Sequence, residues 1–438
     1  MKRLNVYDAA MRRLDVIFNN FDYVYVSFSG GKDSGVLLNM CIEYIRKNAP
    51  HRKLGLFHMD YEAQYSQTTE YVQRVEQANS DILEVFHCCV PFRVSTCTSM
   101  HQPYWRPWQP DMQELWVRPL PEKCYTAKDF DFYDDTLWDY DFQTMFTPWL
   151  RKQKGCEKIC CLVGIRTEES YNRWRVLNSD RNYKHFLGLR WTRLIDNEVC
   201  TAYPIYDWKT TDVWTANGRF GWDYNHLYDL YYQAGVPLSR QRVASPFICE
   251  AIPSLKIYRV IDPDTWGRMV SRVNGVNFAC IYGDTMAMGW KHIKAPNGFS
   301  WKEYMHFLLD TLPEDIRANY LEKLHVSMQF WRKRGGCLSD ETIEKLREAG
   351  VEFTVGKGTA YKTNKKPVMM EYIEDIDIAE FREIPSYKRM CICILKNDHV
   401  CKYMGFSPTK REREMKKNVM TKYKSLKNGE SAEEEPSV

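Results

Sequence analysis

The stretch VYVSFSGGKDSGVLLNM, residues 24–40, changes character halfway along its length. Its first half is an apolar run typical of a buried strand, and its second half has the composition of a helix. Gly30, Gly31 and Lys32 stand at the junction without a spacer. A helix N-terminus presents free backbone N–H groups and the positive end of the helix dipole, which together favour anions. Because glycines also let a backbone approach a ligand closely, the stretch predicts a phosphate-binding loop.

Two common phosphate-binding loops do not fit this stretch. The Walker pattern Gly-x4-Gly-Lys-Ser/Thr needs a glycine where Val26 stands and a hydroxyl group where Asp33 stands. The dinucleotide pattern Gly-x-Gly-x-x-Gly fails because the two glycines are adjacent. The segment matches Ser-Gly-Gly-x-Asp-Ser and resembles the PP-loop of the ATP-pyrophosphatase and adenine-nucleotide α-hydrolase superfamily. The resemblance implies that the pyrophosphate of ATP binds these loop residues: Ser27, Ser29, Gly30, Gly31, Lys32, Asp33 and Ser34.

Strand and helix patterns alternate on both sides of the loop. Apolar runs predict strands at 22–28, 53–59, 82–88, 158–164 and 200–206. Helical periodicity predicts helices at 5–20, 33–48, 64–79, 142–154 and from 210 onward. This alternation indicates an α/β domain with a parallel sheet and flanking helices. We therefore expect a five-stranded, Rossmann-like (HUP-type) PP-loop domain over residues 1–220, with insertions near 91–130 and 176–198.

The remaining chain has a different pattern. Residues 221–350 predict a mostly helical domain, with helices at 224–234 and 301–309 among others. Residues 351–428 form a basic C-terminal region that mixes short strand-like runs with a helix near 408–427. The acidic tail 429–438 has the composition of a disordered segment.

Two further segments carry the resemblance beyond the loop. GIRTEESYNRWR, residues 164–175, resembles the Gly-x-Arg-x-x-Glu-Ser-x-x-Arg segment of phosphoadenosine phosphosulfate (PAPS) reductases. YPIYDWKTTDVW, residues 203–214, resembles the Pro-[Ile/Leu]-x-x-Trp-x-x-x-Asp-Val-Trp segment of the same proteins. The whole chain, including MCICILKNDHVCKYMGF at 390–406, is similar to the IbrA/YbdN subfamily of PAPS-reductase-like proteins. That resemblance implies a ParB-like, sulfiredoxin-fold protein partner.

Candidate ligand groups lie where the predicted strands end. Gly164 leads to Arg166 and Arg173, whose guanidinium groups suit a phosphate; the alternative is that they form surface ion pairs with nearby glutamates. Asp33 and Asp60 are candidates for holding Mg²⁺ with the phosphates, while Asp33 fits a helix cap equally well. Trp208 and Trp214 are expected in the core.

The cysteines argue against sulfonucleotide reduction. The family's reductases carry a nucleophilic cysteine in Glu-Cys-Gly-Leu-His, and this sequence contains no such segment and no Cys-x-x-Cys. Cys88-Cys89 and Cys160-Cys161 fall in predicted strands, where core packing explains them. One C-terminal group could bind zinc or an iron–sulfur cluster, although alternation in a strand explains its first two members equally well. It consists of Cys391, Cys393, His399 and Cys401.

The overall charge of +4 and pI of about 8.2 are too mild to indicate a nucleic-acid binder. The charges are polarised, however: residues 111–141 are acidic and residues 388–427 are basic, so this last segment is either a nucleic-acid contact or a solvated helix. No apolar run is long enough to cross a bilayer, and no secretion signal precedes the 15 cysteines. We expect a cytoplasmic protein with free thiols and no membrane contact.

Three functions remain open from the sequence. The first is an enzyme that binds ATP or a related adenine nucleotide with Mg²⁺ and cleaves or transfers at the α-phosphate with release of pyrophosphate. Its expected catalytic residues are Lys32, Asp33 and Arg166. The second is a nucleotide-sensing regulatory or DNA-associated component without turnover. The third is a sulfonucleotide reductase or sulfur-transfer enzyme.

Overall fold

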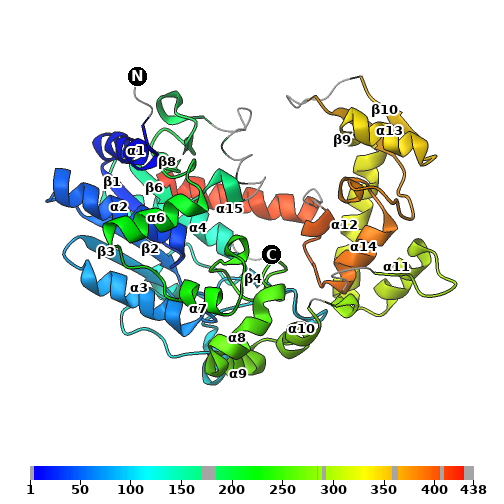
Figure 1. Ribbon diagram of the computed structural model, residues 1–438, viewed down its shortest axis with the longest axis horizontal. Helices are drawn as coiled ribbons and strands as arrows, with labels where there is room; N and C mark the ends of the chain where they lie inside the picture. Colours follow the sequence, from blue (N-terminus) through cyan, green and yellow to red (C-terminus); the bar gives the residue numbers. More distant parts are fainter. Residues whose placement is uncertain are drawn as a thin grey trace.

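The computed structural model describes residues 4–169, 173, 177, 184–283, 285–288, 293–357, 364–404 and 409–428. Figure 1 shows a larger lobe built around a sheet and a smaller lobe beside it, coloured yellow to orange. The expected insertion 176–198 lies partly outside the described residues, and the expected tail 429–438 lies outside them entirely.

The larger lobe is organised by a six-stranded sheet of order β3-β2-β1-β6-β8-β7. The expected parallel strands are all present, with these bounds: β1 (Tyr23–Ser27), β2 (Leu54–Met59), β3 (Leu83–Cys88), β6 (Ile159–Val163) and β8 (Val199–Ala202). The sheet has one strand beyond the five predicted parallel ones, β7 (Thr192–Leu194), which pairs antiparallel with β8 at the edge. This strand is only three residues long, which is too short to give a periodic signal.

Helices cover both faces of the sheet because strand side chains alternate in direction. Val24 and Val26 of β1 face a core that contains α1 (Val6–Asn20), α2 (Lys32–Asn48), α3 (Ser66–Ala78) and α6 (Thr210–Phe220). Tyr25, between them, faces a second core with α4 (Asp139–Lys154). Burial on both faces explains why the central strands are nearly continuous apolar runs.

The insertion at 91–130 is packed into the larger lobe. It contains β4 (Val94–Ser95), β5 (Tyr104–Trp105), η1 (Pro110–Leu115) and η2 (Ala127–Asp129). Trp105 and Trp108 are buried. Trp208 is buried too, as predicted, and its Nε1 donates to the backbone oxygen of Val6 at 3.1 Å. Trp214 is partly buried against the larger lobe's core. Much of the aromatic content is therefore structural.

Helices after the sheet divide between the lobes. α7 (Leu227–Gln233), α8 (Leu255–Ile261), α9 (Pro263–Arg272) and α10 (Val276–Tyr282) contribute to the core that includes α4. The smaller lobe contains α11 (Trp301–Asp310), α12 (Glu314–Lys333), α13 (Asp340–Glu348) and α14 (Tyr387–Leu395). Its three-stranded antiparallel sheet has the order β10-β11-β9, formed by β10 (Phe353–Val355), β11 (Lys366–Met370) and β9 (Gly336–Leu338).

The basic helix α15 (Lys410–Asn428) returns from the smaller lobe and lies along α4 (Figure 1). Tyr423 is buried in the core of the larger lobe, where its hydroxyl donates to Asp196 at 3.0 Å. Lys422 pairs with Asp134 of the acidic segment. Part of the charge polarisation seen in the sequence is therefore compensated within the chain.

The expectation that all cysteines are free thiols was wrong for Cys97 and Cys249, which form a disulfide. The two residues are 152 positions apart, so no local pattern could reveal the pair. In the part of the chain that the structure describes, no helix combines the length and the apolar character needed to cross a bilayer.

Candidate functional site

The PP-loop joins the carboxyl end of β1 to the first turn of α2. Gly30 has a φ of 72°, and a Cβ atom there would lie 2.9 Å from Cγ2 of Thr68. Gly31 is the N-cap of α2 and has extended backbone angles without a side-chain capping bond. The left-handed backbone at position 30 therefore favours glycine, and the N-terminus of α2 lacks a side-chain cap, so a backbone-bound anion suits it.

The two loop serines fix the turn. Ser29 Oγ and Ser34 Oγ are 3.0 Å apart, and Ser34 Oγ also donates to the backbone oxygen of Gly31 at 3.1 Å. The N–H groups of Ser29 and Gly31 donate to these hydroxyls at 3.2 and 3.3 Å. Ser27, at the end of β1, is half-buried. The serines thus hold the loop in its open shape.

Lys32 is covered by residues that come about 200 positions later in the chain, and only 6% of it is exposed. Its Nζ donates to the backbone oxygen of Gln241 at 3.2 Å, and its backbone N–H donates to the Tyr228 hydroxyl at 3.1 Å. Burial lowers the pKa of Lys32, Asp33 opposes that effect, and nearby Arg166 and Arg242 add to it. The amine is therefore held in a site rich in positive charge.

Arg166 is almost fully buried, with 2% exposed, and forms an ion pair with Asp33. It also contacts Glu168 at 3.2 Å, and Arg173 pairs with Glu169. The ion pairs with glutamates that the sequence left as an alternative are thus present. Burial lowers the pKa of Arg173, Asp33 opposes that effect, and Arg242 and Arg166 add to it.

Gly164 lets the end of β6 approach the first turn of α2 closely. A Cβ atom at this position would lie 2.9 Å from the backbone N of Ser34 and 3.0 Å from the carbonyl carbon of Asp33. The end of β6 therefore packs directly on the first turn of α2, which places Arg166 beside the PP-loop.

A cavity of about 620 Å³ adjoins the PP-loop. Thr68, Arg242 and Val243 line it, and Thr68 and Val243 also face the two loop glycines. Rings of Tyr65, Tyr231 and Tyr258 form another part of the wall. The volume lies within the usual range for small-molecule sites.

Comparison with known proteins identifies the family of this chain. The protein "Uncharacterized protein YbdN" of Escherichia coli (strain K12) is 32% identical over 426 residues, which are 96% of this chain and 95% of YbdN. The chain belongs to the YbdN family of PAPS-reductase-like PP-loop proteins. The sequence profile of the phosphoadenosine phosphosulfate reductase domain matches residues 23–89. A profile described as a domain of unknown function (DUF3440) matches residues 235–415.

Solved structures show weaker similarity to this YbdN-family chain. Phosphoadenylyl-sulfate (PAPS) reductase from Candida auris, in a phosphate complex, matches 52% of this chain and 85% of its own at 18% identity and a TM-score of 0.28. The U34-tRNA thiolase NcsA from Methanococcus maripaludis, with its 4Fe-4S cluster, matches 68% and 85% at 14% identity and a TM-score of 0.31. Similarity at this level says nothing about substrate or reaction.

Asp60 does not join Asp33 in the YbdN-family chain. Its carboxylate is buried, accepts from the Glu62 N–H at 2.9 Å, and pairs with Arg118 and with His87. Burial acts to raise the pKa of Asp60, but the charge of Arg118 and the hydrogen bond from His87 outweigh it, so the pKa is lowered. Asp33 has different partners, Arg166 and Lys32. The two carboxylates thus have separate partners, and a Mg²⁺ ion held by both together with the phosphates stays a prediction.

The C-terminal group proposed as a zinc or iron–sulfur site is not assembled as expected. Cys391 and Cys393 lie on helix α14, so the alternative explanation by alternation in a strand was wrong. Cys391 Sγ faces the backbone oxygen of Trp301 at 3.6 Å, whereas His399 Nε2 lies 3.0 Å from the backbone oxygen of Ser99. Within the described residues, the side chains of Cys391, Cys393, His399 and Cys401 do not bring three donor atoms close enough together to bind one metal ion.

Several residues at the site were missed from the sequence. Asn225 is fully buried and donates to the backbone oxygen of Gly30 and to Thr68 Oγ1, both at 2.9 Å. Tyr228 and Gln241 contact Lys32, and Arg242 is exposed without an ion pair among the described residues. These residues come from a range that showed only helical periodicity; the Arg-Gln-Arg run at 240–242 was the one local signal.

Proposed function

We propose that this YbdN-family protein binds ATP, or a related adenine nucleotide, and cleaves or transfers at its α-phosphate with release of pyrophosphate. The observation that carries the proposal is the N-terminus of α2, which has no side-chain cap and lies among four cations. They are Lys32, Arg166, Arg173 and Arg242, and three of them already pair with Asp33 or Glu169 while Arg242 has no ion pair among the described residues. A polyanion at this position would pair with these cations and accept hydrogen bonds from N–H groups of the first turn.

Binding requires an exchange of hydrogen bonds at Lys32. Its N–H and Nζ donate to Tyr228 and to the Gln241 carbonyl in the structure. In our proposal both donors turn to the β- and γ-phosphates, and Arg242 approaches from the adjoining cavity. Arg166 keeps Asp33 in place and completes the cationic wall. The site thereby contributes donors arranged in advance around the leaving group.

The reaction follows from this placement of charge. An oxygen of the acceptor, or of water, bonds to the α-phosphorus while the bond from that phosphorus to the bridging oxygen breaks. Pyrophosphate leaves with the electron pair, and the acceptor's proton passes to solvent. Lys32 and Arg242 neutralise the negative charge that grows on pyrophosphate. Mg²⁺ enters this proposal with the nucleotide's own phosphates, as metal ions commonly do.

The test uses the full chain with ATP and Mg²⁺. Calorimetry measures nucleotide binding, and an enzyme-coupled assay measures pyrophosphate. Lys32→Ala is expected to weaken binding at least about tenfold, since it removes a charge-assisted contact. Lys47→Ala, an exposed lysine at the other end of α2, is the matched control and should bind like the parent. Absence of binding by ATP and by pyrophosphate would overturn the proposal.

A second candidate function, a nucleotide-sensing component associated with DNA, is favoured by the outer face of α15. Arg413, Lys416, Lys417 and Lys424 are exposed there. Deleting α15 would expose Tyr423, so charge reversal is the cleaner test. Lys416→Glu with Lys417→Glu should weaken duplex DNA binding and flatten its salt dependence. Lys47→Glu with Lys302→Glu is the control; equal DNA binding by both pairs would exclude α15 as the contact.

A protein partner is part of the same proposal. Resemblance to the IbrA/YbdN subfamily favours a ParB-like, sulfiredoxin-fold protein. Pyrophosphate release measured with and without that protein separates an enzyme that is active alone from one that needs its partner. If co-purification fails and the added protein leaves the rate unchanged, this partner is excluded.

A further inference from the structure

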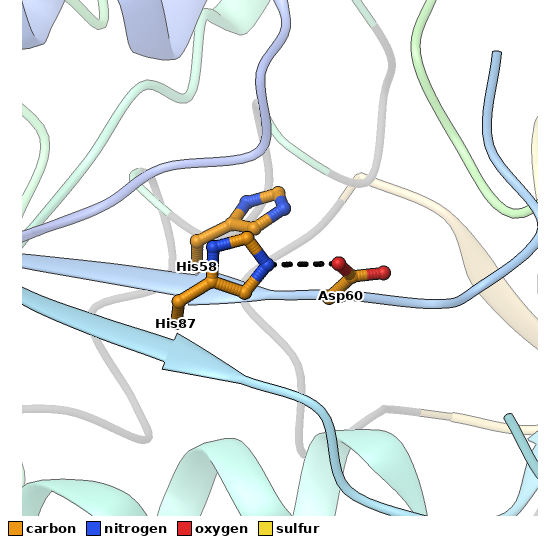
Figure 2. Close-up of side chains that lie close together, drawn as sticks. All are labelled: His58, Asp60 and His87. Carbon is orange, nitrogen blue, oxygen red and sulfur yellow. Dashed lines mark hydrogen bonds and ion pairs between the residues drawn. The ribbon is translucent and has the colours of Figure 1, made fainter. Parts of the chain in front are cut away.

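His58, Asp60 and His87 meet at the ends of two neighbouring strands, away from the phosphate contacts of the PP-loop. His58 and His87 face each other across the parallel pair β2–β3, and Asp60 directly follows β2. All three are buried, with 1%, 0% and 3% exposed. One ligand atom from each lies within 4.8 Å of the others (Figure 2). We propose that this group is a binding site for a divalent transition-metal ion.

The outer nitrogen of each imidazole is already held by an oxygen. His58 Nδ1 lies 2.8 Å from the backbone oxygen of Phe28, which can only accept, so Nδ1 carries the hydrogen and Nε2 presents a lone pair. His87 Nδ1 lies 2.9 Å from Glu76 Oε1, and its Nε2 lies 2.8 Å from Asp60 Oδ2 (Figure 2). Metal-binding histidines typically have such oxygen partners behind them.

A network of ion pairs alone does not account for the whole group. Asp60 and Glu76 have positive partners in Arg118 and His87, and these pairs would be complete without His58. Yet His58 is buried beside them, and the hydrogen bond that its ring makes in the structure is the one from Nδ1 to the backbone oxygen of Phe28. Its Nε2 is therefore available to a ligand placed between His87 and Asp60. A metal ion at this position uses all three side chains, which the ion pairs alone do not.

The donors define the class of metal. Two imidazoles and one carboxylate suit Zn²⁺, Fe²⁺, Co²⁺ or Mn²⁺, whereas Mg²⁺ and Ca²⁺ prefer oxygen ligands. The ion takes the place of the hydrogen between His87 Nε2 and Asp60 Oδ2. Arg118 can remain on the carboxylate, because a second oxygen is available to it. The site therefore favours a different class of ion from the Mg²⁺ that accompanies a nucleotide.

The site is coupled to the PP-loop through one carbonyl. Phe28, which accepts from His58, directly precedes Ser29 of the loop, and its N–H donates to Phe57 O at 2.8 Å. A bound ion would fix His58 relative to β3 and so fix the entry to the loop. We expect metal to stabilise this edge of the sheet whether or not a nucleotide is present.

The test measures metal directly on the full chain without nucleotide. Protein stripped with a chelator is titrated with Zn²⁺ by competition calorimetry and with Co²⁺ by visible absorption, whose bands report nitrogen ligation. One tight site per chain is expected. Glu76→Gln should weaken Zn²⁺ about 10–100-fold, and His58→Gln should weaken it further. His399→Gln, which changes another buried histidine, is the matched control and should bind like the parent.

Folding is monitored in the same samples. Zn²⁺ should raise the melting temperature of the parent and of the His399 variant, and leave that of His58→Gln unchanged. The proposal is overturned if the parent takes up no Zn²⁺ or Co²⁺, or if folded His58→Gln binds either ion as tightly as the parent. Neither outcome depends on nucleotide binding, so this test and that of the proposed function fail independently.

Discussion

Arg166 donates from Nε to Oδ1 of Asp33 at 2.6 Å, so a buried arginine after β6 holds the first-turn carboxylate of α2. Asp33 therefore does not act as the N-cap, a position that Gly31 occupies. The contact joins two segments that are 133 residues apart in the chain. The shape of the PP-loop thus depends on how closely β6 approaches α2.

That dependence predicts a large effect for Gly164→Ala. The added methyl group would meet backbone atoms of Ser34 and Asp33 at 2.9 and 3.0 Å, and backbone cannot move aside cheaply. We expect a loss of about 1–3 kcal/mol in the free energy of unfolding, with weaker pyrophosphate binding. Denaturant unfolding and calorimetry measure the two effects. Gly218→Ala on α6, where a methyl group meets nothing within 4 Å, should be neutral or stabilising. Equal stability of the two variants would contradict the argument.

Removing the Tyr228 hydroxyl should separate stability from anion binding. Tyr228→Phe leaves the buried N–H of Lys32 without its acceptor, which costs about 1–3 kcal/mol in the ligand-free protein. A bound phosphate restores that hydrogen bond, so pyrophosphate should raise the melting temperature of the variant more than that of the parent. Tyr232→Phe, at an exposed site, is the control. A smaller rise in the Tyr228 variant would show that phosphate does not reach this N–H group.

The buried pair Glu62–Arg272 should be a strong tie between the sheet edge and α9. Arg272 Nε lies 2.9 Å from Glu62 Oε1, and Glu62 also accepts from the backbone N–H groups of Trp108 and Val117. Arg272→Gln leaves a buried carboxylate without its cation, so we expect a loss of about 3–5 kcal/mol. Arg317→Gln breaks the exposed pair with Asp310 and should cost less than about 1 kcal/mol. Thermal and denaturant unfolding compare the two, and similar losses would refute the ranking.

Cys124 should be the thiol that reacts near neutral pH. A hydrogen bond from Cys89 and, to a lesser extent, the charge of His87 lower its pKa to about 7, although burial acts in the opposite direction. Thiolate rather than thiol reacts with iodoacetamide, so the labelling rate should rise with pH and reach half of its maximum near pH 7. Mass spectrometry of peptides after timed labelling gives the profile.

The comparison residue for this labelling is Cys156, which is also partly exposed and whose pKa is raised by burial. Its rate should still be increasing above pH 9. If the labelling rate of Cys124 depends on pH in the same way as that of Cys156, Cys124 is not a thiolate near neutral pH. The remaining support for a sulfur-transfer or reductive role would then be lost.

Local patterns were enough for the central strands and for the PP-loop. The change from an apolar run to glycines and then to a helix is written in consecutive residues, so β1 and α2 could be placed from sequence. Tyr228 and Gln241 could not, because they reach Lys32 from about 200 positions away in the chain. The metal-site proposal has the same origin: His58 and His87 are ordinary strand residues until β2 and β3 pair.

The C-terminal cysteines show a different limit. The run that contains Cys391 and Cys393 is short and apolar, and such a run suits a strand or a buried helix equally well. Ser386 decides the matter, because its side chain accepts from the Arg389 N–H and caps α14. A serine before the run was therefore a helix-start signal that alternation concealed.

Helix α15 has a consequence for how the protein folds during synthesis. The smaller lobe lies between α10 and α15 in the chain, yet Tyr423 and Val419 of α15 pack in the core of the larger lobe. That core therefore stays incomplete until the ribosome has passed residue 428, after the whole smaller lobe has been made. In contrast to the usual order, in which N-terminal domains finish first, the larger lobe begins first and is completed last.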